Sequence, residues 1–254
     1  MRRIACLSLV TLVLAAAPAA ADKKPAAPDT AFVRIGSGDA STGAFVAYPP
    51  GGVAGPGVVM AHEWWGLNNQ IRSMARRLAH DGGYVVIVPD LYHGKVADDP
   101  EEAHVLMRGL EGAVADSDCA AAASYLRSDK RVKGPIGAMG FCMGGGVALD
   151  YGIHDPSVAA VVMFYGSPNT DPAQLAKLKG PVLAHFGLKD DGIPQSRIDQ
   201  FSTAMEKAGR DLKVYTYPAA GHAFMNDTRP SYQPESARQA WARTLDFLQH
   251  QLRR

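Results

Sequence analysis

The chain has 254 residues, of which 47% are hydrophobic and 20% are charged, and its formal net charge is +1. This composition allows one large folded domain with a substantial core. The balanced charge argues against nucleic acid or an anionic membrane surface as the main partner, because proteins that bind those carry a basic excess.

The N-terminus has the pattern of an export signal. Arg2 and Arg3 form a positive segment, residues 4–17 form a short apolar run, and alanines at 19–21 offer a cleavage site. We therefore expect a signal peptide over 1–21, a leader over 22–30, and one domain over 31–254 that is periplasmic or secreted. An uncleaved membrane anchor is the alternative, although the run is short for a transmembrane helix.

Strands and helices are predicted to alternate along the rest of the chain. Two alternating segments, 32–35 and 43–48, predict an antiparallel hairpin. Short apolar runs predict buried strands at 57–61, 84–88, 135–139, 158–164, 181–186 and 212–217. Helical spacing predicts helices at 69–80, 101–110, 113–127, 146–151, 195–208 and 234–252. This order is typical of an α/β fold with a mostly parallel central sheet and helices on both faces.

Gly140-Phe141-Cys142-Met143-Gly144 lies between a predicted strand and a predicted helix and has the glycine–x–nucleophile–x–glycine form. The nucleophile of such an elbow sits on a sharp turn, and the glycines avoid collisions with the neighbouring strand and helix. A phosphate loop would need a lysine followed by serine or threonine, and a dinucleotide fingerprint belongs in the first βαβ unit. The pattern therefore predicts an α/β-hydrolase fold with a cysteine nucleophile.

The predicted acid and base follow two later strands. In hydrolases of this fold the chain order is nucleophile, acid, histidine. Asp190 and Asp191 follow the strand at 181–186, and His222 follows the strand at 212–217. His222 would take the proton from the thiol, while a carboxylate would fix the tautomer of the imidazole. Asp190 is favoured because it stands three residues after Gly187, and Asp191 is the alternative.

The loop after the first central strand predicts half of an oxyanion hole. In this fold that loop supplies one backbone N–H, and the residue after the nucleophile supplies the other. The expected donors are Trp64 and Met143. His62 and Glu63 also suggest zinc, but a zincin needs a second histidine four places after the first, where Gly66 stands. No metal and no cofactor are expected.

With these features in place, the chain resembles the dienelactone hydrolase family over roughly residues 56–250. The segments that carry the resemblance are HEWWGLN at 62–68, PDLY at 89–92, GFCMGG at 140–145 and AGHAF at 220–224. The resemblance implies a triad of Cys142, His222 and Asp190, and a glutamate, Glu63, that interacts with the resting thiol. It also implies hydrolysis of a carboxylate-bearing enol-lactone through an acyl-thioester.

The chain departs from the best-known members at two positions. They carry an arginine shortly after the Asp-Leu-Tyr segment and another four residues after the histidine, and both bind the substrate carboxylate. Here those positions hold Gly94 and Asn226, with Lys95 and Arg229 nearby. Lysine and arginine are not interchangeable at a bidentate site, so dienelactone itself is a doubtful substrate. The familiar members are also cytoplasmic.

These features together predict an exported enzyme that hydrolyses a small-molecule ester or lactone, with no nucleic-acid partner. The expected pocket residues are Trp65, Tyr92, Phe141, Phe224 and Arg229. A catalytically silent binding module is the alternative from another class, and the intact triad argues against it. A thiol redox protein would need a resolving cysteine, for which Cys119 is the sole candidate, and a disulfide between Cys119 and Cys142 is the further alternative.

Overall fold

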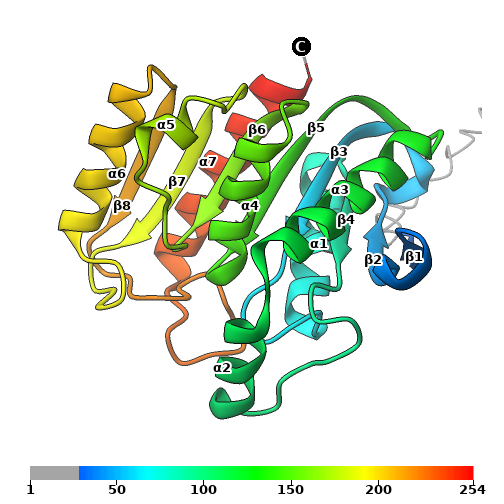
Figure 1. Cartoon of the computed structure of the whole chain (residues 1–254), viewed down its shortest axis with the longest axis horizontal. Coiled ribbons are helices and arrows are strands. Elements are labelled where there is room, and N and C mark those ends of the chain that lie inside the picture. Colours follow the sequence, from blue (N-terminus) through cyan, green and yellow to red (C-terminus); the bar gives the residue numbers. More distant parts are fainter. Residues whose placement is uncertain (1–28, 254) are drawn as a thin grey trace, which may run out of the picture.

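An eight-stranded sheet with the strand order β1-β2-β4-β3-β5-β6-β7-β8 forms the centre of the molecule (Figure 1). The computed structural model describes residues 29–253, so the predicted signal peptide and most of the predicted leader lie outside the described residues. The strands are β1 (Thr30–Ile35), β2 (Thr42–Ala47), β3 (Gly55–Ala61), β4 (Val85–Pro89), β5 (Val132–Phe141), β6 (Val158–Phe164), β7 (Val182–Gly187) and β8 (Leu212–Tyr217). Strands β3 to β8 are parallel, whereas β1 and β2 form the antiparallel hairpin at one edge.

Helices cover both faces of the sheet. They are α1 (Asn69–Gly82), α2 (Pro100–Gly109), α3 (Gly112–Ser128), α4 (Met143–His154), α5 (Pro172–Leu175), α6 (Gln195–Lys207) and α7 (Pro234–Leu252). Helices α3, α4 and α6 bury their apolar residues in the core on one face, and α1 and α7 bury theirs on the other. Strands β3 and β4 are buried along their whole length because both faces are covered. The predicted α/β architecture, with a mostly parallel central sheet and helices on both faces, is therefore confirmed.

Local sequence accounts for the boundaries of α1. The Asn68 side chain accepts a hydrogen bond from the N–H of Ile71 at the start of the helix. Gly83 ends the helix with a φ of 67°, a left-handed conformation that glycine adopts without steric cost. No helix among residues 29–253 is both long and apolar enough to span a membrane.

All the predicted strands and helices are present, and the bounds of β6, β8 and α7 are as predicted. Two differ in ways that matter for the site. Strand β5 begins at Val132 instead of residue 135, because its first residues lie outside the core and give no apolar run. Helix α4 begins at Met143 instead of residue 146, directly after Cys142. The single-turn helix α5 is too short to give a periodic pattern and was not predicted.

Candidate active site

Cys142 occupies the sharp turn between β5 and α4. Its φ of 53° and ψ of −124° are rare for a residue with a side chain, and such strain is often found at functional sites. A Cβ at Gly140 would overlap the carbonyl oxygen of Gly144, and a Cβ at Gly144 would overlap the carbonyl oxygen of Ala61. Both positions therefore require glycine, because the obstructing atoms belong to the backbone.

The structure brings Cys142, His222 and Asp190 together at the carboxyl ends of β5, β8 and β7. The Nε2 atom of His222 lies 3.1 Å from Sγ of Cys142, and its Nδ1 atom lies 2.7 Å from Oδ2 of Asp190. The other carboxylate oxygen of Asp190 accepts hydrogen bonds from the N–H groups of Gly192 and Ile193. Because both carboxylate oxygens have hydrogen-bond partners, the orientation of the buried Asp190 side chain is fixed. The neighbouring Asp191 is exposed.

The two partners of His222 decide its protonation state. Burial lowers the pKa of the imidazole, but the hydrogen bonds to Asp190 and Cys142 outweigh burial and raise the pKa of His222 to about 10. This shift favours the protonated imidazole at neutral pH. In that form both ring nitrogens carry a proton, so Nδ1–H donates to the Asp190 carboxylate and Nε2–H lies toward Sγ of Cys142.

Glu63 lies buried beside this group. Its carboxyl accepts a hydrogen bond of 3.2 Å from the Tyr165 hydroxyl and one of 2.7 Å from the Asn226 amide. Burial raises the pKa of Glu63, and the two hydrogen bonds oppose that rise. Asn226, at a position where the family resemblance implies a substrate-binding arginine, thus holds Glu63 instead. Within residues 29–253 no hydrogen bond joins Glu63 to Cys142, so control of the thiol by Glu63 stays a prediction.

The two predicted oxyanion donors lie on segments that touch. Met143 is the first residue of α4, where a helix leaves its N–H groups without helical acceptors. Trp64 lies in the loop after β3. Neither N–H has a hydrogen-bond acceptor among residues 29–253. A Cβ at Gly144 would overlap the carbonyl oxygens of Ala61 and His62, so the loop and the elbow pack backbone against backbone.

Comparison with known proteins decides the family. The family model for the dienelactone hydrolase family matches residues 42–252. The chain belongs to this family. A protein of Methylorubrum extorquens strain AM1, provisionally named a carboxymethylenebutenolidase, is 33% identical over 231 residues, which cover 85% of this chain and 79% of that protein. A protein of Escherichia coli K12 with the same provisional name is 33% identical over 207 residues, 76% of each chain.

A solved structure supports the same conclusion. The crystal structure of a provisionally named dienelactone hydrolase from Klebsiella pneumoniae has a TM-score of 0.78 and 30% identity, and covers 87% of this chain and 98% of that one. This member of the dienelactone hydrolase family is therefore a hydrolase of lactone or ester bonds that acts on a small molecule.

The predicted pocket residues of this hydrolase divide into two groups. Phe141 and Phe224 lie in the core, where Phe141 stacks on Phe164 and Phe224 packs against Tyr165. The other three lie in or against the oxyanion loop, residues 62–68. The guanidinium of Arg229 lies 3.8 Å from the ring centroid of Trp65. Tyr92 is mostly buried, and its hydroxyl donates to the Trp64 carbonyl. Gly94 and Lys95 are exposed.

Tyr165 is a site residue that sequence reasoning missed. It follows β6, has a φ of 39°, and packs its ring edge-on against His222 at a centroid distance of 5.2 Å. Its hydroxyl binds Glu63, so it touches two members of the site. Its position at the carboxyl end of a central parallel strand was the available signal, because sites of open α/β sheets lie at that edge.

An open cavity of about 470 Å³ lies between residues 91–95, α2 and the start of α3. Among the predicted pocket residues, Tyr92 lines it. Helix α2 also approaches the oxyanion loop, where the ring of His104 packs edge-on against Trp64 at 4.8 Å. The residues that line the cavity include none of Trp64, Cys142 and His222, so the cavity meets the site through Tyr92 alone.

Proposed function

We propose that this hydrolase is an exported enzyme that cleaves its ester or lactone with Cys142 as nucleophile, His222 as acid and base, and Asp190 as the orienting carboxylate. The observation that carries the proposal is the position of His222, whose two ring nitrogens lie 3.1 Å from Cys142 Sγ and 2.7 Å from Asp190 Oδ2. A nucleophile, a base and an orienting group in one line are what covalent catalysis of acyl transfer requires.

In the first step the sulfur of Cys142 attacks the carbonyl carbon, and the carbonyl electron pair moves to oxygen. The N–H groups of Trp64 and Met143 stabilise that oxyanion. The carbonyl re-forms, the bond to the leaving oxygen breaks, and the leaving alkoxide takes the Nε2 proton of His222. The product of this step is an acyl-thioester on Cys142, and for a lactone the alcohol remains part of the same acyl group.

In the second step His222, now neutral, removes a proton from water as the water oxygen attacks the thioester carbon. The tetrahedral intermediate collapses, the bond from carbon to sulfur breaks, and the carboxylic acid leaves. Sulfur recovers its electron pair and His222 keeps the proton from water, so the site returns to its starting state. No oxidant, metal or cofactor takes part in either step.

A panel of aryl esters and lactones tests the mechanism with the mature protein and its Cys142→Ala variant. We expect turnover that vanishes in the variant and that does not depend on added reductant. Cys119→Ala is the matched control, because Cys119 is a free, buried cysteine on α3 and should be dispensable. Equal turnover in Cys142→Ala, or none in wild type with its thiol shown to be free, would contradict the mechanism. The second result would favour a binding module.

Export is a separate part of the proposal and rests on residues 1–21 of the sequence. Expression of the whole chain in a Gram-negative host, followed by N-terminal sequencing of the periplasmic protein, should give Asp22 as the first residue. Protein that keeps Met1 in the cytoplasmic fraction would contradict export, and protein that keeps Met1 in the membrane fraction would support an uncleaved anchor.

A further inference from the structure

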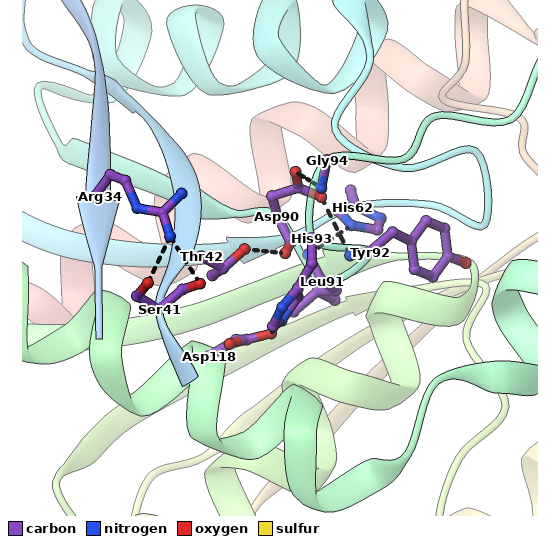
Figure 2. Close-up of polar contacts among 10 residues, drawn as sticks. All are labelled: Arg34, Ser41, Thr42, His62, Asp90, Leu91, Tyr92, His93, Gly94 and Asp118. Atoms are coloured by element: carbon purple, nitrogen blue, oxygen red, sulfur yellow. Dashed lines mark hydrogen bonds and ion pairs between the residues drawn. The ribbon is translucent and has the colours of Figure 1, made fainter. Parts of the chain in front are cut away.

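His62 is a fully buried histidine between the oxyanion loop and the turn that follows β4 (Figure 2). Its Nδ1 atom lies 2.7 Å from the carbonyl oxygen of Glu63, and its Nε2 atom lies 3.2 Å from the backbone nitrogen of Leu91. A carbonyl oxygen only accepts and a backbone N–H only donates, so Nδ1 carries the proton and Nε2 is free to accept. Burial lowers the pKa of His62 and keeps this neutral tautomer.

The hydrogen bond from His62 to the Glu63 carbonyl fixes the direction of the Trp64 N–H, a proposed oxyanion donor. The carbonyl of Glu63 and the N–H of Trp64 belong to one peptide unit, and no peptide bond among the described residues is cis. A trans peptide is planar, so its carbonyl and its N–H point in opposite directions. The Glu63 carbonyl accepts hydrogen bonds from both His62 Nδ1 and the N–H of Gly66, at 3.1 Å. The Trp64 N–H must therefore point away from His62.

The turn at residues 90–94 is itself tightly held. The two carboxylate oxygens of Asp90 accept hydrogen bonds from the N–H groups of Tyr92 and Gly94, at 3.2 and 2.7 Å. The hydroxyl of Thr42 on β2 donates to the Asp90 carbonyl at 2.8 Å. Figure 2 shows these bonds together with the bond from Leu91 to His62. The donor to His62 thus belongs to a turn that is fixed to the sheet.

Tyr92 makes a second link from the same turn to the oxyanion hole. Its hydroxyl lies 3.2 Å from the carbonyl oxygen of Trp64, to which it donates, and 3.2 Å from the Met143 sulfur. Its ring packs edge-on against His62 at a centroid distance of 4.9 Å. One side chain thus contacts both residues that would supply an oxyanion N–H.

We propose that His62 and Tyr92 are positioning residues of the oxyanion hole, through which the turn at 90–94 orients the Trp64 N–H and fixes its separation from the Met143 segment. This inference rests on the proposed function. Its physical basis is that a preorganised donor stabilises an oxyanion only when it lies within hydrogen-bond distance of the developing charge. Neither residue contacts Cys142 or His222 through a hydrogen bond among residues 29–253.

The rates of ester hydrolysis and of Cys142 alkylation together distinguish positioning of the oxyanion hole from a general effect on the site. Ester hydrolysis needs the oxyanion hole, whereas alkylation of Cys142 by iodoacetamide is substitution at a saturated carbon and forms no oxyanion. Tyr92→Phe removes one oxygen atom, and His62→Phe removes both hydrogen bonds of the ring. We expect kcat to fall about tenfold in Tyr92→Phe and about a hundredfold in His62→Phe, because loss of one donor costs about a hundredfold to a thousandfold. KM and the alkylation rate should change by less than about twofold.

Tyr48→Phe is the matched control, because Tyr48 is a buried tyrosine that donates to Asp129 away from the site. It should match wild type in both rates. An unchanged kcat in Tyr92→Phe would overturn the inference, and so would an alkylation rate that falls in parallel with kcat. If His62→Phe does not fold, the result for Tyr92→Phe alone tests the inference. Absence of hydrolysis in wild type would overturn the proposed function and this inference with it.

Discussion

Replacing Asp190 by asparagine keeps the shape of the orienting group and should abolish its function. In the native site one oxygen of Asp190 accepts from Gly192 and Ile193, and the other accepts from His222 Nδ1. Asparagine has one acceptor oxygen, and the two backbone N–H groups require it. The amide NH₂ must then face Nδ1, which forces that nitrogen to become an acceptor and places the ring proton on Nε2. A neutral His222 in this tautomer cannot take a proton at Nε2, where Cys142 and the attacking water need it.

The expected loss is large because the variant traps the wrong tautomer. The same exchange in a serine-protease triad lowers kcat by about ten thousandfold, so we expect a fall of about a thousandfold to ten thousandfold here. At about 1.4 kcal/mol per tenfold this corresponds to about 4–5.5 kcal/mol of transition-state stabilisation. The assay is kcat for an aryl ester, measured with a thermal melt to show that the variant is folded.

Asp191→Asn is the matched control for this prediction. Asp191 is the next residue and is exposed, so its variant should keep wild-type kcat. The reasoning is refuted if Asp190→Asn loses less than about tenfold, since the tautomer would then not be set by Asp190. An equal loss in Asp191→Asn would show that the choice between the two carboxylates is wrong.

Three further variants test other parts of the structure. In denaturant titrations, Gly140→Ala should lower the free energy of unfolding by about 3 kcal/mol or more, because the added Cβ would overlap the Gly144 carbonyl oxygen. Gly112→Ala is the control and should have little effect, because a Cβ there meets nothing within 4 Å. Equal effects of the two variants would contradict the steric argument. Asn226→Arg places a cation beside Glu63 and should raise kcat/KM for an anionic half-ester about tenfold relative to a neutral ester; an unchanged ratio would show that this position does not set charge preference. The pKa of His222 is raised from 6.5 to about 10 in the folded state, so the stability that its partners provide is complete below about pH 6.5 and is lost as pH rises toward about 10. The difference in unfolding free energy between wild type and His222→Gln should shrink over that range, and a constant difference would refute the linkage.

Local patterns made much of this site predictable. Gly140 is required by a contact with the backbone of Gly144, four residues away, and Gly144 is required by the backbone of the loop after β3. The elbow can therefore be recognised from a pattern of five residues. Asp190 and His222 each follow a buried strand, and parallel strands end at one edge of the sheet. The predicted order of strands and helices therefore places Cys142, Asp190 and His222, which are distant in sequence, at one edge of the sheet.

Contacts between segments that are distant in sequence could not be predicted from local patterns. Glu63 lies 163 residues from Asn226 and 102 residues from Tyr165, and no local pattern links them. Phe141 and Phe224 flank functional residues in the sequence, yet both point into the core. The direction of a side chain at a strand end depends on the turn that follows, and a turn with positive φ is not fixed by hydrophobic pattern.

The strand order explains how one site draws on six parallel strands. Strand β5 lies near the middle of the sheet and is followed by Cys142, the proposed nucleophile, so groups can reach it from both sides. On one side β3 and β4 supply the oxyanion loop and the turn that holds it (Figures 1 and 2). On the other side β6 is followed by Tyr165, whose hydroxyl donates to Glu63, and β7 and β8 are followed by Asp190 and His222, the proposed acid and base. In the proposed mechanism, stabilisation of the oxyanion therefore depends on the β3–β4 side of the sheet, and proton transfer depends on the β7–β8 side. Because of this separation, a variant on the β4 side should slow hydrolysis without slowing alkylation of the thiol, whereas a variant on the β7 side should slow both.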